Sequence, residues 1–163
     1  MPWSLYAVGL LAAFLLQTAV LPLLPLDAVD LLLTLALICG LAAPVPEARL
    51  AGWGAGFVKD LDTDGPLGLH AVLCGLAVLL LTVVRAQLNL QLWWVRWLLA
   101  TAVAWPVELA ARLHQALTLG TSASVGGLVL GSLLTAVVAG LLAALLLALP
   151  GRAPRRRASH RRW

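Results

Sequence analysis

Charged side chains are scarce in this sequence. Only 11% of its 163 residues are charged, and 62% are hydrophobic. Charged residues make up about a quarter of an ordinary soluble domain, so the composition argues against that class. It predicts an integral membrane protein instead.

Cysteine and histidine are also few, and none of them suggests a reaction. Cys39 and Cys74 fall in hydrophobic runs, where packing is the simpler reading and a disulfide or metal site the alternative. His70 and His114 are interpreted as interface residues, because neither has a serine partner in register. Intramembrane catalysis needs converging groups, and the aspartates fall in predicted loops or helix ends. We therefore expect no enzyme activity and no cofactor.

Long, nearly uncharged runs recur along the chain. About 18 to 20 apolar residues in a helix cross a hydrocarbon layer of roughly 30 Å, and a spanning segment must satisfy its own backbone hydrogen bonds. We predict an all-α membrane protein with a six-helix transmembrane domain over residues 1–150 and a basic cytoplasmic tail over residues 151–163. The third helix is predicted to be too short to cross alone. The predicted spans are Trp3–Leu21, Val29–Ala43, Leu50–Val58, Leu67–Val84, Leu92–Leu109 and Val125–Leu149.

The C-terminal tail decides the expected orientation. Basic residues in short loops stay cytoplasmic, so six spans place both termini inside, together with Arg49, Arg85 and Arg96. Five spans would put the N-terminus outside with no gain in the positive count. We expect the tail to contact anionic lipid, at about 1 kcal/mol per basic residue, and not nucleic acid, since no aromatic-rich folded platform accompanies it. Its arginines are Arg152, Arg155, Arg156, Arg157, Arg161 and Arg162.

The stretch GAGFVKDLDTDGPLGLH, residues 54–70, gathers acid, base, glycine and proline. Asp60, Asp62, Asp64 and Gly65 imitate the opening of a calcium-binding loop, but the twelfth position of such a loop needs a glutamate and is Ala71 here. We therefore favour an external turn in which water solvates the acids. Asp64 is placed to cap the following helix.

The same stretch resembles the signature of the rod shape-determining membrane protein MreD family. A glycine-rich short segment is followed by an aspartate, a brief polar stretch, Gly-Pro-Leu-Gly and a new apolar helix. Lys59 departs from the family pattern, which usually has an apolar residue there, and Asp62 and Asp64 replace small polar residues. The matching positions are Gly52, Gly56, Phe57, Asp60, Gly65, Pro66, Leu67, Gly68 and Leu69.

The resemblance implies a non-enzymatic scaffold of the bacterial cell-elongation complex in the inner membrane. Such a protein would bind the single-pass protein MreC and work beside MreB, RodA and a class B penicillin-binding protein to maintain cell shape. Helices in lipid associate through small residues, and the last helix offers a stripe of them. That stripe either meets a partner helix or closes the protein's own bundle. It consists of Gly127, Gly131, Thr135 and Ala139.

Polar groups inside predicted spans are the remaining candidates. Glu108 precedes Arg112 by one turn, which predicts an ion pair or, alternatively, a ligand or proton site. Trp93, Trp94 and Trp97 are typical of an interfacial aromatic belt. The six-helix layout is also similar to the substrate-binding S subunits of energy-coupling-factor vitamin transporters. We rank that function second, because the sequence is poor in polar side chains that could line a vitamin site.

Overall fold

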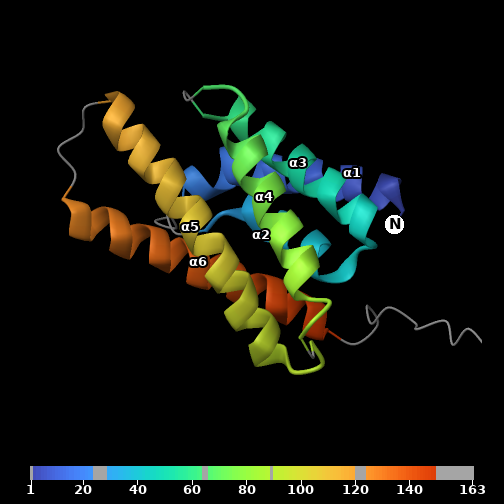
Figure 1. Ribbon diagram of the computed structural model, residues 1–163. Coiled ribbons are helices and arrows are strands. Elements are labelled where there is room, and N and C mark those ends of the chain that lie inside the picture. The colour runs from blue at the N-terminus through green and yellow to red at the C-terminus, as the bar shows by residue number, and fades with distance from the viewer. Residues whose placement is uncertain (1, 24–28, 64–65, 89, 120–123, 150–163) are drawn as a thin grey trace, which may run out of the picture.

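The computed structural model describes residues 2–23, 29–63, 66–88, 90–119 and 124–149, and their fold is helical throughout. Six α-helices follow one another and no described residue forms a strand, which confirms the all-α class (Figure 1). The first helix continues as a π turn, η1 (Leu16–Val20), and a short 3-10 turn, η2 (Leu21–Leu23). The helices are α1 (Trp3–Leu15), α2 (Leu31–Ala42), α3 (Val45–Leu61), α4 (Leu69–Val84), α5 (Trp93–Leu119) and α6 (Val125–Ala148).

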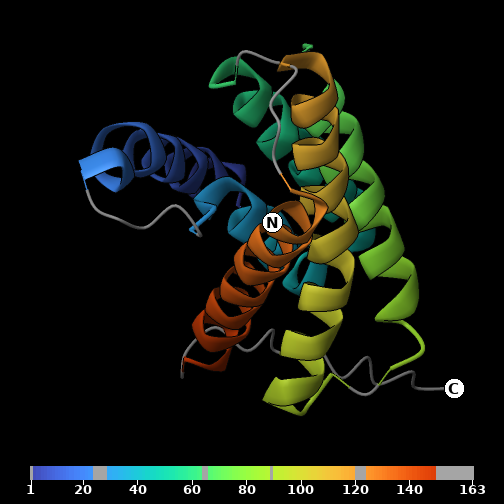
Figure 2. The same ribbon diagram turned by 90° about the vertical axis from the view of Figure 1, so that its left-hand side faces the viewer.

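Close helix packing gives the relative direction of two helix pairs. In α3, a Cβ added to Gly52 would lie 2.7 Å from the Val78 side chain, and one added to Gly56 would lie 2.3 Å from the backbone oxygen of His70. The later residue of α3 therefore meets the earlier part of α4, so the two helices are antiparallel. α5 and α6 are also antiparallel, and they lie side by side in Figures 1 and 2.

The short helix α2 lies at the centre of the bundle. It contacts each of the other five α-helices, and Leu32, Leu33 and Leu37 are fully buried. A helix of only 12 residues can occupy this central position because the neighbouring helices cover it. A polar side chain from η1 satisfies backbone amides at the start of α2: Gln17 accepts hydrogen bonds from the Leu31 and Leu32 amides, at 3.0 and 3.2 Å.

Arginines satisfy the carbonyl groups at one end of the bundle. Arg85, after α4, donates to the backbone oxygens of Gly40 and Ala43 at 2.6 and 2.7 Å, where α2 ends. Arg96 in α5 donates to the Leu90 oxygen at 2.6 Å, and its guanidinium lies 3.4 Å from the Leu147 oxygen near the end of α6. The last carbonyls of a helix have no partner within the helix, so these contacts close both helix ends.

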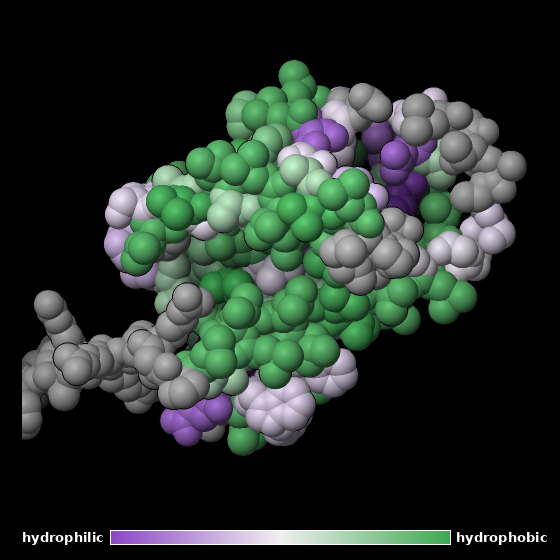
Figure 3. Space-filling view, turned by 180° about the vertical axis from the view of Figure 1, so that it is seen from behind, coloured by the Kyte–Doolittle hydropathy of each residue, from purple (hydrophilic) through white to green (hydrophobic). Residues whose placement is uncertain are grey.

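The outer surface is largely apolar. In the face seen in Figure 3, hydrophobic residues cover most of the described surface and hydrophilic residues are confined to small areas. Two helical stretches in the described part of the chain are long and apolar enough to cross a membrane, Trp3–Leu23 and Val125–Ala148. The helices Leu31–Ala42 and Leu69–Val84 are apolar but shorter.

Two helices are longer than the sequence predicts. The third was expected over Leu50–Val58 and extends over Val45–Leu61, and the fifth continues ten residues past Leu109. Both extensions contain charged residues that apolar runs exclude by definition. The structure accommodates these residues in helices because most of them face partners inside the bundle.

Candidate functional site

Buried charged and titratable side chains gather near the end of the bundle opposite Arg85 and Arg96. Asp30, Lys59, Asp60, His70 and Glu108 come from the start of α2, the end of α3, the start of α4 and the middle of α5, and each is at most 8% exposed. These groups are largely removed from water, so each needs a partner inside the protein. The expectation that the acids of this stretch lie in a solvated loop is wrong for Asp60.

Lys59 joins three helices. Its ammonium group forms ion pairs with Asp30 and with Glu108, the latter at 2.9 Å between Nζ and Oε1. Asp30 is also the N-cap of α2, and its Oδ1 accepts a hydrogen bond from the Leu33 amide at 2.8 Å. One cation therefore pairs with two carboxylates that lie far from it in the sequence, and Arg112 supplies the second positive charge beside Glu108. The departure from the family pattern at Lys59 was the signal for this ion pair, but it does not indicate the partners.

Asp60 caps the start of α4. Its carboxylate accepts hydrogen bonds from the amides of Gly68, His70 and Ala71 at 3.0, 2.8 and 3.0 Å. It also lies 3.0 Å from Nδ1 of His70. The first amides of a helix lack internal partners, so a carboxylate here satisfies several at once. We expected Asp64 to take this role, but Asp64 and Gly65 lie outside the described residues.

The motif residues surround this Asp60 cap. Gly68 has φ of +100°, a left-handed conformation that glycine adopts without strain, and it turns the chain into α4. Gly52 and Gly56 allow α3 to approach α4 at backbone distance. Phe57 and Leu67, in contrast, are 53% and 73% exposed, and Pro66 is exposed as well.

The small-residue stripe of α6 divides in two. Thr135 and Ala139 are buried, whereas Gly127 is exposed and a Cβ added to it would meet only the Ser124 hydroxyl, at 3.1 Å. Gly131 faces the Arg112 guanidinium. The stripe therefore packs inside the bundle at Thr135 and Ala139 and borders Arg112 at Gly131, and only Gly127 is left exposed. The tightest glycine contact of α6 is at Gly140, which the sequence pattern missed, where a Cβ would lie 2.4 Å from the Thr101 hydroxyl.

Glu108 and Arg112 lie close together, as their spacing predicts, but they are not mainly each other's partners. Arg112 Nε is 3.7 Å from Glu108 Oε2, while Glu108 Oε1 binds Lys59. The Arg112 guanidinium also donates to the Thr135 hydroxyl at 2.8 Å. A line of polar contacts therefore runs from α2 through α3 and α5 to α6.

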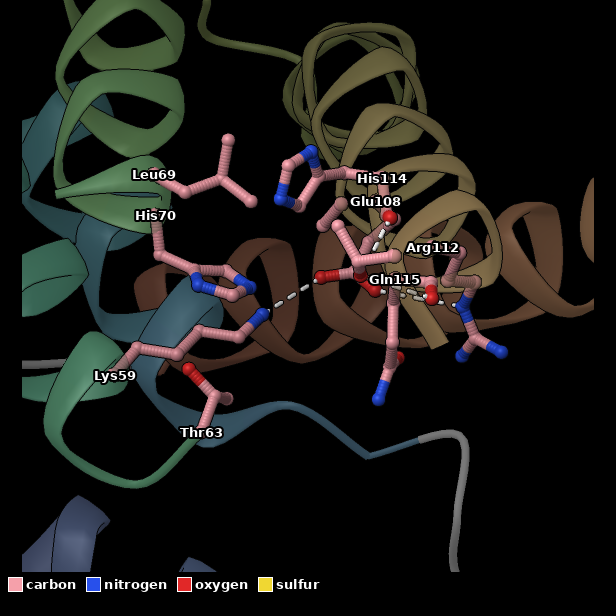
Figure 4. A pocket seen from close by; sticks show the side chains of 10 residues that line it. Lys59, Thr63, Leu69, His70, Glu108, Arg112, His114 and Gln115 are labelled. Atoms are coloured by element: carbon pink, nitrogen blue, oxygen red, sulfur yellow. Dashed lines mark hydrogen bonds and ion pairs between the residues drawn. The ribbon is translucent and has the colours of Figure 1, made fainter. Parts of the chain in front are cut away.

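A cavity of about 320 Å³ opens beside these charges (Figure 4). Lys59 and His70 line one side, and Glu108, Arg112, His114 and Gln115 of α5 line the other. The two histidines, expected to be interface residues, thus border this space from α4 and α5. Cavities of this size hold small ligands or molecular headgroups.

The other candidates are placed as follows. No group of three His, Cys, Asp or Glu among the described residues is arranged to hold a metal ion, and Asp62 is exposed. Cys39 and Cys74 are buried and unpaired, at helix-packing positions. Trp93 and Trp94 are about half exposed near the start of α5, and Trp97 is partly buried. The tail arginines lie outside the described residues.

Comparison with protein-family models, with curated proteins and with solved structures finds no match.

Proposed function

We propose that this protein is a non-enzymatic, multi-pass membrane scaffold of the bacterial cell-elongation complex, of the MreD type. Its role is to hold MreC and to help position peptidoglycan synthesis by MreB, RodA and a class B penicillin-binding protein. Six helices cross the inner membrane in this proposal, with both termini in the cytoplasm and the arginine tail on anionic lipid.

The observation that carries the proposal is the common role of four motif residues. Gly52 and Gly56 bring α3 against α4, Asp60 caps α4, and Gly68 turns the chain into it. Four residues that resemble a family signature thus form one closely packed, capped α3–α4 joint. A scaffold needs such a joint because partners bind best to a surface whose helices do not shift.

The exposed first half of α6 is the proposed contact for a partner helix. Gly127 leaves room for the close backbone approach by which helices associate in lipid, and Val125 and Leu130 beside it are 77% and 68% exposed. At Gly127 no other described helix lies within 4 Å of an added Cβ.

Capture from the native membrane tests the proposal. The tagged protein is extracted in mild detergent, and bound proteins are identified by mass spectrometry. We expect MreC and the elongation synthases. We further expect Gly127→Leu to reduce the recovered MreC several-fold at unchanged thermal stability. Gly126→Leu, on the same helix but about 100° around it, is the matched control and should retain MreC. Absence of every elongation protein would overturn the proposal.

A second candidate function is a substrate-binding S subunit of an energy-coupling-factor transporter. The polar cavity favours it, because the sequence suggested too few polar side chains for a ligand site and the structure gathers eight of them in one place. Capture of a coupling subunit with a pair of ATPases would establish this function instead of the scaffold.

A further inference from the structure

We propose that the cavity between α3, α4 and α5 binds an uncharged small molecule that carries several hydroxyl groups. This site goes beyond the scaffold function, and it stands or falls independently of MreC binding. The same chemistry is offered by a free sugar and by the sugar headgroup of a glycolipid. The experiment below distinguishes these two sources.

The first argument is that the charges around the cavity balance one another. Lys59, Glu108 and Arg112 are the charged residues that line it, and Asp30 pairs with Lys59 behind them. Lys59 also pairs with Glu108 at 2.9 Å, and Arg112 Nε lies 3.7 Å from the same carboxylate. Two positive groups thus face two negative groups. An added ion would leave one charge uncompensated in a place largely removed from water, so the cavity suits an uncharged ligand.

The second argument is an acceptor that His70 presents to the cavity. Asp60 accepts backbone amide hydrogens at both of its carboxylate oxygens. The carboxylate is therefore the acceptor for His70 as well, and the ring nitrogen beside it, Nδ1 at 3.0 Å, carries the hydrogen. Nε2 is then the nitrogen with a free lone pair. His70 lines the cavity and its ring extends toward α5 (Figure 4), so a ligand hydroxyl can donate to Nε2.

The third argument comes from the uncharged side chains of the lining. The Thr118 hydroxyl donates to the His114 backbone oxygen at 2.9 Å, which leaves its own oxygen as an acceptor. The exposed Gln115 amide carries one acceptor and one donor group, and the Thr63 hydroxyl stands on the opposite side of the cavity (Figure 4). Acceptors thus surround the space from several directions. A molecule with several O–H groups matches them better than an amide, whose donors share one nitrogen.

The size of the cavity limits the ligand to one small molecule or one headgroup. Its volume of about 320 Å³ is at the lower end of the range for small-molecule sites. Leu69 and Ala111 add apolar surface to the lining, against which a carbon frame can pack.

The test uses the purified full-length protein in a detergent without a sugar headgroup, with thermal unfolding followed by tryptophan fluorescence. One series compares glucose with ionised glucuronate and glucosamine, which keep the ring and add one charge of either sign, at constant ionic strength. The other compares monoglucosyldiacylglycerol with diacylglycerol, which has the same chains and no sugar. We expect a saturable rise in Tm in at least one series, because a ligand that binds the folded state stabilises it.

The pattern of response identifies the source of the ligand. A rise with glucose identifies a soluble sugar, and a rise with the glucolipid alone identifies a lipid headgroup. In the first case, glucuronate and glucosamine should both need about tenfold higher concentrations, because each brings an unpaired charge.

Variants decide whether the effect comes from this cavity. His70→Asn keeps an amide donor for Asp60 and removes the Nε2 acceptor, and Gln115→Ala removes an exposed amide of the lining. Each should raise the midpoint of the saturable effect several-fold. Gln87→Ala is the matched control, because Gln87 is exposed after α4, at the opposite end of the bundle, and its replacement should leave the midpoint unchanged. If His70→Asn fails to fold, Gln115→Ala alone decides.

No saturable stabilisation by glucose or by the glucolipid would overturn the proposal. The same holds if a charged derivative binds more tightly than glucose, or if Gln115→Ala binds with the wild-type midpoint.

Discussion

At the residue scale, Lys59 controls the balance of buried charge. It is 7% exposed and lies between Asp30 and Glu108, which are equally buried. An ion pair of this kind contributes little compared with apolar residues of the same size, because desolvation opposes the attraction. Removing only one partner is different, since it leaves buried charge without compensation.

We therefore expect Lys59→Met to destabilise the protein by about 3–5 kcal/mol, the range for breaking a buried pair. The free energy of unfolding would be measured in mixed detergent and SDS micelles. Adding Asp30→Asn and Glu108→Gln to Lys59→Met should recover much of the loss, because no buried carboxylate then remains unpaired. A Lys59→Met variant with wild-type stability would contradict the paired geometry.

At the element scale, α4 depends on a cap that comes from another helix. Its N-cap residue is Gly68, which has no side chain to accept a hydrogen bond, and Asp60 of α3 supplies the missing acceptor. The end of α3 and the start of α4 are thereby fixed to each other. This coupling explains how the chain can turn between two buried helix ends.

Replacing Asp60 with alanine should loosen the start of α4. Three amides would lose their acceptor, and we expect a loss of at least about 1–3 kcal/mol, the cost of one unsatisfied buried donor. Hydrogen exchange of the Gly68, His70 and Ala71 amides should accelerate before the rest of α4 does. Asp62→Ala is the control: Asp62 is exposed two residues away, and its replacement should leave these amides unchanged.

The α3–α4 contact gives a second prediction at this scale. A Cβ at Gly56 would lie 2.3 Å from the His70 backbone oxygen and 2.6 Å from the Ala71 Cα, so Gly56→Ala must push the helices apart. We expect clear destabilisation in the same unfolding assay, of about 1–3 kcal/mol, as for other overpacked sites. Gly126→Ala, where no atom lies within 4 Å, should be neutral or gain up to about 1 kcal/mol of helix propensity. Equal effects of the two substitutions would contradict the close approach.

At the scale of the whole molecule, sequence periodicity and hydropathy predicted where the helices lie better than which residues of different helices contact one another. Each expected span corresponds to one α-helix, because apolar runs are local features. The ends of α3 and α5 were missed since the apolar runs end at Val58 and Leu109, before the charged residues Lys59, Asp60 and Arg112. Their acceptability inside helices depends on partners such as Asp30 and Thr135, which are remote in the sequence. The cavity was missed for the same reason.

The proposed six crossings lead to the last prediction. With six crossings, the chain ends that precede and follow each helix must reach opposite sides of the membrane in turn. Four exposed positions sample these ends: Leu23, Val45, Leu67 and Leu88. Single cysteines at these positions, in a background without Cys39 and Cys74, should be labelled by a membrane-impermeant reagent from outside, inside, outside and inside, respectively.

The pair Leu23 and Val45 discriminates between topologies. If α3 does not cross, the chain has five spans, and these two positions exchange sides while Leu67 and Leu88 keep theirs. The sequence predicts six spans because Arg49, Arg85 and Arg96 would then lie at the cytoplasmic surface, where basic residues are retained. Replacing Arg155, Arg156 and Arg157 with glutamate tests the same bias from the tail, and should make a cysteine near residue 163 accessible from outside in part of the molecules. An unchanged pattern in that variant would mean that α1 to α5 fix the orientation without the tail.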